Sequence, residues 1–580
     1  MDSETEFGFV SFLKGAVQIA RTLKWLSLAL CLSFAYRADA QTVRASSCNA
    51  KDVQKALNSV KADGAIVNIP AGSCHWTTIV TYNQAYSTTI QGAGAQTPGG
   101  GIDQTIIYDN VNHGSAGGGA IFALTSAAGK NLRITGIAVF TDSANPTTAY
   151  NGVVAIYGKS KSVRIDHNHF HIGGNGTHGL QTSGWLNGVI DHNLFDQGGN
   201  IFFIEFASPG WNGTSDPAGY GNSSWADGPN FGTGNFMFAE DNTFTGGGWA
   251  FDCIAGARFV FRNNTLGYHT SVQTHGLTSS VFRGCRAMEV YNNTLTYSNN
   301  PSTENFAFVV QLESGTGLWW GNTITGFVQF IHEDTVRTNK VTYPETAPPN
   351  GWGYCGSGVS GALSPWDGNT NPTGYPCIDQ VGRGKGDIVT GKDWPNLLNT
   401  ATGTIAWPHQ ASEPVYVWNN TFNTVGYSSD AFWANADSVS VENRDYYLQL
   451  PNVKEPAKFN GTAGIGQGPL SGRPGTCTPF VGYWATDQKT LYQCTAANTW
   501  TAFYTPFTYP HPLTKAPSPK AKLEANPEFG GRKPNFESAK RNDLLEQKIE
   551  QKSSELAAQF LNGLRPCHPI ATNCESRGIL

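Results

Sequence analysis

Apolar and polar residues alternate with a period of two along most of the chain between Cys48 and Asp445, and short turns interrupt the alternation. The segment "RFVFRNNTL" from Arg258 is representative, and a period of two is typical of β-strands. The turns share an asparagine: Asn168, Asn193, Asn242, Asn264, Asn293, Asn322 and Asn420. Most successive asparagines are 22 to 29 residues apart, which predicts one coil of a parallel β-helix per step. The longer steps predict coils that carry insertions.

The turns themselves predict a ladder of side chains. Asparagine tolerates the left-handed conformation that a sharp corner needs, and stacked coils about 4.8 Å apart let equivalent amides bond to one another. Two turns repeat the phrase Asp-His-Asn. There we expect His167 and His192 to stack, with Asp166 and Asp191 accepting hydrogen bonds, while a metal site built from these four residues stays open as the alternative.

The start of the repeat region carries a helical pattern. Val53, Leu57 and Val60 recur at helical spacing, and "AIVNIP" from Ala65 then predicts the first strand. An amphipathic helix at this place would cover the open end of a solenoid, whose unpaired edge would otherwise pair with another chain.

The first residues predict export. A basic segment, the apolar run "WLSLALCLSFAY" and the small residues "ADA" before Gln41 form the pattern of a signal peptide, with an uncleaved anchor as the alternative. We therefore expect a secreted, extracellular or periplasmic protein. The expected organisation is a signal peptide over 1–40, a β-helix over 41–450 with insertions at about 207–234 and 335–414, a small disulfide-closed β module over 451–514, and a linker with an amphipathic helical tail over 515–580.

Cysteine usage supports an oxidising compartment. Of the eleven cysteines, Cys31 lies in the signal, and the other ten fall in sequence pairs, although spacing alone does not establish the pairing. The pairs are Cys48/Cys74, Cys253/Cys285, Cys355/Cys377, Cys477/Cys494 and Cys567/Cys574. Among these cysteines and the histidines no set has the spacing of a zinc site.

Charge excludes one class of partner. Only 14% of residues are charged and the formal net charge is -5, without a basic block in the repeat region. Because phosphate binding needs clustered lysine and arginine, we do not expect a nucleic-acid partner.

The helical cap, the first strand "GAIVNIPAG", the segment "TTIQGAG" and the asparagine coils resemble the pectate-lyase-like superfamily. The resemblance covers about Cys48 to Asp445 and implies a right-handed parallel β-helix, an all-β fold. It implies no single reaction, because that superfamily includes polysaccharide lyases, glycoside hydrolases, epimerases, esterases and non-catalytic adhesins. Calcium is a common cofactor of its pectate lyases, so Ca²⁺ enters as a cofactor implied by resemblance only.

Ionisable residues recur on the strand that follows each turn. When the coils are aligned on their asparagines, they form an expected column along one sheet: Glu205, Asp252, His275, Glu313, His332 and Glu333. Three of these strands also carry a glutamine, which predicts a second ladder from Gln273, Gln311 and Gln329.

Two reactions on a polysaccharide fit this column. In β-elimination on a uronate-containing glycan, His275 would be the base and Arg283 or Arg286 would stabilise the developing charge. In hydrolysis, Glu205 and Asp252 on adjacent coils would be the acid–base pair. We favour elimination at this stage because histidines and arginines concentrate between positions 269 and 286.

The insertions add expected substrate contacts. Trp225 and Trp352 could stack on sugar rings, and Arg383 and Lys385 lie on a glycine-rich loop that could hold a carboxylated sugar. The alternative for each is a packing or solubility role. A different class of protein also stays open, namely a non-catalytic glycan-binding or fibre protein associated with the cell surface.

Overall fold

A computed structural model describes residues 40–113, 119–141, 152–216, 219–268, 270–276, 283–297, 308–333, 379–387, 398–399, 404–405, 410–423, 432–435, 440–450 and 459–515. The expected signal peptide, the tail beyond 515, most of the second insertion and the pairs Cys355/Cys377 and Cys567/Cys574 lie outside these residues. No helix in the described part is long and apolar enough to cross a membrane.

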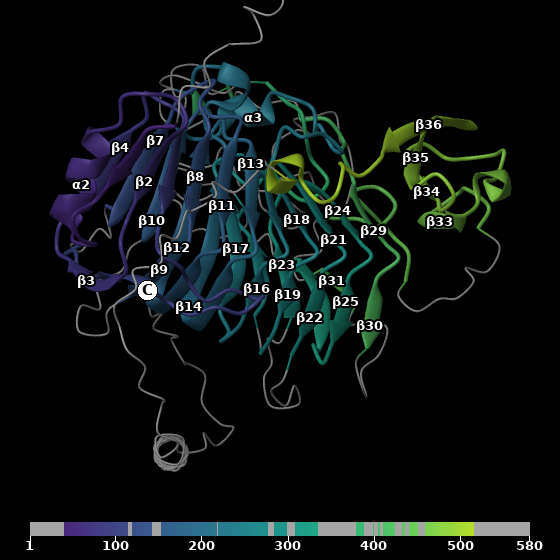
Figure 1. The fold of residues 1–580 in the computed structure, drawn as a ribbon. Coiled ribbons are helices and arrows are strands. Elements are labelled where there is room, and N and C mark those ends of the chain that lie inside the picture. The colour runs from purple at the N-terminus through teal and green to yellow at the C-terminus, as the bar shows by residue number, and fades with distance from the viewer. Residues whose placement is uncertain are drawn as a thin grey trace, which may run out of the picture. The chain divides into compact units, whose positions relative to one another are not determined.

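The chain forms a right-handed parallel β-helix, as expected. Its first face is a sheet of 12 strands in which each strand pairs in parallel with the equivalent strand of the next coil (Figure 1). The strands of the first face are β1 (Thr42–Arg44), β2 (Ala65–Asn68), β5 (Thr88–Gln91), β8 (Leu132–Thr135), β11 (Val163–Asp166), β13 (Gly188–Asp191), β15 (Met237–Glu240), β18 (Arg258–Arg262), β21 (Ala287–Tyr291), β24 (Thr316–Trp320), β29 (Val415–Trp418) and β32 (Tyr446–Leu448).

Two further faces complete each coil. The second face contains β3 (Gly72–Trp76), β6 (Thr105–Asp109), β9 (Ala138–Thr141), β12 (His169–Gly184), β14 (Leu194–Ala207), β16 (Thr243–Phe244), β19 (Thr265–Leu266), β22 (Thr294–Thr296), β25 (Thr323–Thr325) and β30 (Thr421–Asn423). The long strands β12 and β14 continue into the third face, where they pair with other strands. These are β4 (Val80–Asn83), β7 (Phe122–Ser126), β10 (Val154–Gly158), β17 (Trp249–Ile254), β20 (Val272–Thr274), β23 (Phe308–Leu312), β26 (Gln329–Glu333) and β31 (Trp433–Asn435).

The interior is a stack of apolar side chains. Phe170, Phe195 and Phe244 occupy equivalent places in successive coils and stack with ring centroids 4.8 and 4.7 Å apart. All three side chains are buried. The spacing equals the distance between paired strands, so the backbone register alone brings the rings into contact.

The asparagine ladder is confirmed. In the seven turns, the backbone N–H and the Nδ2 of each asparagine donate to Oδ1 of the next, over 2.9 to 3.1 Å. The expected reason was wrong in one respect. The left-handed residue is the one before each ladder asparagine, with φ between 52° and 66°, and none of the seven asparagines has a positive φ. The asparagine is needed for its amide rather than for its backbone freedom.

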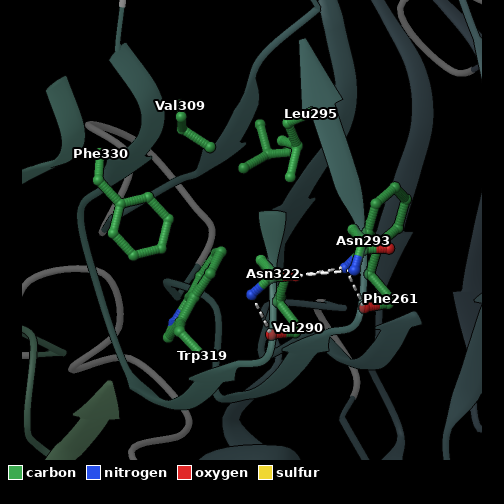
Figure 2. Close-up of a pocket in the computed structure, with 9 residues that line it drawn as sticks. Phe261, Val290, Asn293, Leu295, Val309, Trp319, Asn322 and Phe330 are labelled. Atoms are coloured by element: carbon green, nitrogen blue, oxygen red, sulfur yellow. Dashed lines mark hydrogen bonds between the residues drawn. The ribbon is translucent and has the colours of Figure 1, made fainter. Parts of the chain in front are cut away.

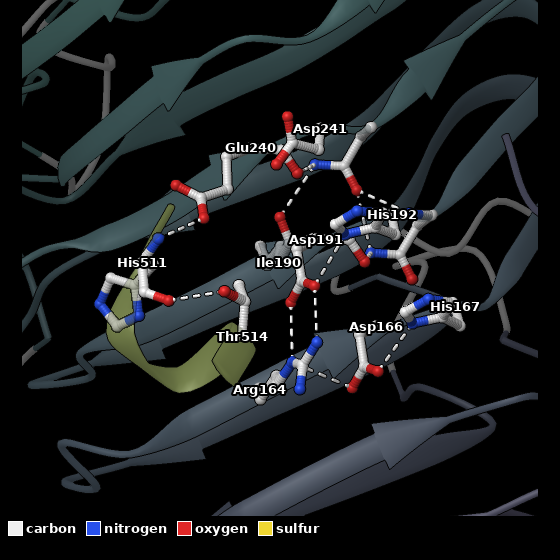
Figure 3. A network of polar contacts seen from close by, with 12 residues as sticks. Arg164, Asp166, His167, Ile190, Asp191, His192, Glu240, Asp241, His511 and Thr514 are labelled. Carbon is white, nitrogen blue, oxygen red and sulfur yellow. Dashed lines mark hydrogen bonds and ion pairs between the residues drawn. The ribbon is translucent and has the colours of Figure 1, made fainter. Parts of the chain in front are cut away.

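The two Asp-His-Asn turns carry the expected histidine stack (Figure 3). The rings of His167 and His192 are parallel with centroids 5.2 Å apart, and each Nδ1 contacts the carboxylate of the preceding aspartate. Asp166 and Asp191 also receive arginine side chains, from Arg133 and Arg164 respectively. The carboxylates are thus fully used in holding the corner, which favours the structural interpretation.

The N-terminal cap is confirmed as helix α2 (Ala50–Asn58), which buries Val53 and Leu57. The disulfide between Cys48 and Cys74 ties the start of the helix to β3. Sequence analysis missed β1, which pairs with β2 at the edge of the first face. Of the expected disulfides, Cys253–Cys285 and Cys477–Cys494 are also formed.

The first insertion packs on the coils through a buried arginine. It contains the short helices η1 (Trp211–Gly213) and α3 (Asn222–Trp225). Arg258 is 2% exposed and donates to the Ser224 hydroxyl and to the backbone oxygens of residues 224, 227, 228 and 229. One side chain therefore satisfies four carbonyls of the insertion.

The C-terminal β module is a four-stranded sheet. Its strands are β33 (Ile465–Gly468), β34 (Gly482–Ala485), β35 (Thr490–Ala496) and β36 (Thr499–Tyr504). Trp484 lies against Trp320 and Trp418 of the first face, with centroids 5.2 and 5.4 Å away. The chain then runs back along this face to helix η7 (Pro512–Lys515), where the backbone N–H of His511 donates to Glu240 (Figure 3). Tyr483 and Trp484 are buried in this packing, so they do not form an exposed glycan platform.

The ladder makes a first prediction. Asn264→Ala removes the acceptor of the buried Asn242 N–H and the donor to the Ala239 carbonyl, and each unsatisfied buried group costs about 1 to 3 kcal/mol. We expect a loss of roughly 3 kcal/mol in the free energy of unfolding, measured by urea titration. The neighbouring exposed Thr265→Ala is the control, with a change within about 0.5 kcal/mol. Equal stability of both variants would show that the ladder does not stabilise the coils.

The docked module makes a second prediction, on pH. Burial raises the pKa of Glu289, which accepts from Gly232 and Tyr504, to about 7. Between pH 4.5 and 7, Glu289 therefore keeps a proton in the folded chain that it has released in the unfolded chain. The contribution of Glu289 to the free energy of unfolding consequently falls as pH rises through this range. Glutamine does not titrate, so the free energy of unfolding of Glu289→Gln minus that of wild type should increase by on the order of 3 kcal/mol from pH 4.5 to 7. A difference between Glu289→Gln and wild type that stays constant with pH would contradict the raised pKa of Glu289.

Candidate functional site

Three polar side chains lie in line on the third face. Gln181 of β12, Glu205 of β14 and Asp252 of β17 are direct partners in the parallel register of adjacent coils. Their neighbours along each strand, such as Phe206 and Cys253, are buried in the core. Because side chains alternate across a strand, the three polar groups point off the sheet on the outer side.

A histidine accompanies each carboxylate. His178 Nδ1 lies 2.7 Å from Glu205 Oε2, and His275 Nδ1 lies 2.6 Å from Asp252 Oδ2. Gln181 Nε2 donates to the other oxygen of Glu205, and the Cys253 backbone N–H donates to Asp252 Oδ1 over 2.7 Å. Ligand atoms of His178, Glu205 and Asp252 lie within 4.8 Å of one another. The site is thus two adjacent His–carboxylate pairs.

The backbone around His275 is held from three sides. Its N–H donates to the Cys253 carbonyl, and its own carbonyl accepts from Cys285 N–H and from the Ser314 hydroxyl. The disulfide Cys253–Cys285 closes the same corner. These contacts fix the backbone at His275, which directly follows the last residue of β20.

The polar column continues beyond the pairs, with one correction. Gln273, Gln311 and His332 are register partners on β20, β23 and β26. Gln329 was expected in this ladder, but it pairs with Phe308, three positions before Gln311, and instead lies by His332 Nδ1. Glu313 follows β23, where its carboxylate accepts from Gly276 N–H and from Gln311.

The structure gives the two expected charge-stabilising arginines other partners. Arg283 is 0% exposed and lies 2.5 Å from Asp379, with Asn222 as a further acceptor. Arg286, also 0% exposed, lies 2.8 Å from Glu413. Both guanidinium groups are enclosed and matched by a carboxylate, so their contacts are those of buried ion pairs and not of substrate-binding cations.

Some of the residues expected to contact substrate are buried in packing contacts, and others are exposed. Trp225 is fully buried, its Nε1 donates to the Gly284 carbonyl, and its ring lies against both arginines. Glu333 is 1% exposed and accepts from Trp433. Arg383 is 3% exposed and contacts Ser412, whereas Lys385 is exposed on the same loop. Trp352 lies outside the described residues.

Two residues of the site were missed in the sequence. His178 and Gln181 lie on the strand that follows the Asn168 turn, one coil before Glu205. Gln181 follows its ladder asparagine by one residue more than Glu205 follows Asn193. A pairwise alignment of these two strands, instead of the search for ionisable residues alone, would have placed the glutamine beside the glutamate.

The donor set does not fit calcium. Ca²⁺ takes six to eight oxygen ligands, whereas this cluster presents two imidazoles and shares its carboxylate oxygens with them. No step of the chemistry below is therefore assigned to Ca²⁺.

A small pocket elsewhere belongs to the core. It lies between coils inside the β-helix, lined by apolar side chains such as Phe261, Trp319 and Phe330, with two asparagines of the ladder at its edge (Figure 2). Its lining is interior packing, so it is not a second candidate site.

No family model matches the chain, and no curated protein matches it by sequence. Among solved structures, ORF18 of Geobacillus virus E2 is 12% identical over 50% of this chain and 58% of that chain, with a TM-score of 0.22. The family 28 exopolygalacturonase of Yersinia enterocolitica is 15% identical over 50% and 67%, with a TM-score of 0.24. The catalytic domain of Agl-KA is 14% identical over 51% and 58%, with a TM-score of 0.25. Similarity this low carries no functional argument, and the parallel β-helix fold rests on the sheet topology.

The buried arginine makes the third prediction. Removing one partner of a buried ion pair leaves the other charge uncompensated, at a cost of about 3 to 5 kcal/mol. Arg283→Ala should therefore lower the free energy of unfolding by that amount in urea titration, while the exposed Lys385→Ala should leave it within about 0.5 kcal/mol. An Arg283→Ala variant of unchanged stability that binds a uronate glycan more weakly would restore the charge-stabilising role.

Proposed function

We propose that the third face is the active site of an exported enzyme that hydrolyses a polysaccharide, with Glu205 and Asp252 as its pair of carboxyl groups. The observation that carries the proposal is their placement: they extend side by side from adjacent coils, with a ligand atom of each within 4.8 Å of the other. Export is supported by the three disulfides, which are typical of oxidising compartments.

The spacing of the carboxylates bears on the reaction. Glycosidases that retain anomeric configuration place their carboxyl groups about 5 to 5.5 Å apart, and inverting enzymes about 6.5 to 9.5 Å apart. The approach within 4.8 Å agrees better with the shorter spacing. We therefore infer a double displacement, in which one carboxylate forms a glycosyl intermediate that water then cleaves.

The hydrogen bonds distinguish the two carboxyl groups. A backbone N–H can only donate, so the contact from Cys253 favours the carboxylate form of Asp252, as a nucleophile requires. Glu205 instead accepts from a side chain, Gln181 Nε2, whose amide oxygen accepts from the Tyr157 hydroxyl. Asp252, which has the backbone donor, is assigned as the nucleophile. Glu205 is assigned as the acid that protonates the leaving oxygen, and His178 and His275 as positioning residues.

The surroundings suit a sugar chain. Three half-buried aromatic residues, Tyr157, Phe202 and Trp249, border the pairs, and Phe202 lies edge-on to His178 with centroids 5.0 Å apart. The C–H faces of sugar rings are apolar and pack on such rings. Glu205 and Asp252 are only 2% and 1% exposed, and removal from bulk water strengthens their action on a bound substrate.

β-Elimination stays as the second candidate because of one contact. Asp252 lies 2.6 Å from His275 Nδ1, the arrangement by which a carboxylate orients a histidine as a base. This reaction also needs a cation for the developing charge, and the enclosure of Arg283 and Arg286 leaves that role without a residue on the described part of the face.

The fourth prediction tests the pair. On a panel of uronate and neutral polysaccharides, wild type should release reducing ends without a rise in absorbance at about 235 nm, the signal of an unsaturated uronate. Glu205→Gln and Asp252→Asn should each lower kcat/KM by at least about 100-fold, because general acid and nucleophilic catalysis are lost. His167→Asn is the matched control, since its half-exposed ring lies at the corner away from the pairs.

Each other result has a defined meaning. A rise at about 235 nm that His275→Gln abolishes would replace hydrolysis with elimination. A folded protein that gives neither product on the whole panel, yet retains binding to one glycan, would favour the non-catalytic class. Circular dichroism of every variant confirms that a loss of product is not a loss of fold.

A further inference from the structure

A second group of histidines and acids lies on the second face, away from the pairs just described. His169 and His171 are two residues apart on β12, and side chains at this spacing lie on the same side of a strand. Asp196 on β14 is the register partner of His171 in the next coil. Ligand atoms of these three residues lie within 4.8 Å of one another.

The contacts converge on one carboxylate oxygen. Asp196 Oδ1 lies 3.0 Å from His169 Nε2 and 2.6 Å from His171 Nδ1. The side chains of His171 and Asp196 are 32% and 27% exposed, so one side of the cluster is open to solvent. Two imidazole nitrogens and a carboxylate thus face a common point that an external ligand can reach.

The ring of His169 is oriented by a second carboxylate, that of Asp103. Its side chain is only 4% exposed, and its Nδ1 lies 2.9 Å from Asp103 Oδ2. The other oxygen of Asp103 accepts from the Gln96 backbone N–H, which fixes the carboxylate. Nε2 is buried and faces the Asp196 carboxylate, 3.0 Å away. A carboxylate behind one imidazole nitrogen, with the second nitrogen aimed into a cluster, is the usual support of a metal-binding histidine.

The arrangement of charges also suits a cation. The carboxylates of Asp103 and Asp196 lie 2.9 and 3.0 Å from the two ring nitrogens of His169. Two carboxylates therefore surround His169 and favour a cation at this place, whether a proton or a metal ion.

We propose that His169, His171 and Asp196 bind a divalent transition-metal ion of the Zn²⁺ class, with Asp103 as the positioning residue behind His169. Two imidazoles and one carboxylate suit Zn²⁺ and its neighbours better than Ca²⁺ or Mg²⁺. Tetrahedral ligands about 2.0 to 2.1 Å from zinc lie roughly 3.4 Å apart, so the nitrogens need to move from Asp196 by less than about 1 Å. The open side leaves the fourth position to water or an external ligand.

A metal ion at this site would cross-link neighbouring coils. His169 and His171 belong to one coil, Asp196 to the next, and Asp103 comes from the loop before β6. A bound ion would therefore join separate parts of the second face, and metal binding to the folded chain alone would stabilise it. This role does not depend on the reaction at the third face.

The fifth prediction uses Zn²⁺ itself as the probe. The full chain, freed of metal with a chelator, should bind one equivalent of Zn²⁺ in calorimetric titration, and Co²⁺ in its place should give a visible spectrum that Zn²⁺ abolishes. His171→Gln and Asp196→Asn should each weaken that equivalent by at least about 10-fold, and Asp103→Ala by about 10 to 100-fold. Both ligand residues are partly exposed, so these variants should fold.

The matched control is His178→Gln, because His178, Glu205 and Asp252 are the other described group with metal-binding spacing. The Zn²⁺ equivalent should survive in this variant. No binding to wild type, or binding lost in His178→Gln but kept in His171→Gln, would overturn the proposal and leave His169 as an imidazolium held between two carboxylates.

Discussion

The constraint on which the structure depends is the in-register stacking of parallel strands. Each coil places its residues directly against their equivalents in the next, at the strand spacing of about 4.8 Å. The asparagine ladder and the Phe170–Phe195–Phe244 stack are both consequences of that repeat. Functional chemistry follows the same rule, because a polar residue repeated at one position becomes a column of neighbouring groups on the surface.

The two candidate sites use this rule on different faces. On the third face, register brings Glu205 beside Asp252, with histidines from the flanking segments. On the second face, it brings Asp196 beside His171. The first face has its outer surface covered by the first insertion and the C-terminal module, which Arg258 and Trp484 hold in place. Both candidate sites lie on the other two faces.

The burial of Arg283 and Arg286 is the reason that our proposal moves from elimination to hydrolysis. A cation near a histidine in the sequence resembles a charge stabiliser, but the free energy of a buried guanidinium depends on its partner. Asp379, which pairs with Arg283, lies in the second insertion, far away in the sequence. A contact between an insertion and a coil has no periodic signature, so the sequence could not reveal that this charge was already matched.

The sequence by itself determined the coil, the helical cap and the turn asparagines, because period and turn chemistry are local properties that successive coils repeat. Cysteine order suggested the disulfide pairs, and the structure established three of them. The sequence also placed Glu205 and Asp252 on one sheet. Only the tertiary structure decided which histidine accompanies each carboxylate, that Gln329 lies outside the glutamine ladder, and that His169 and His171 meet Asp196. These contacts depend on the exact register between coils of unequal length, and a one-residue difference in a loop changes which side chains meet.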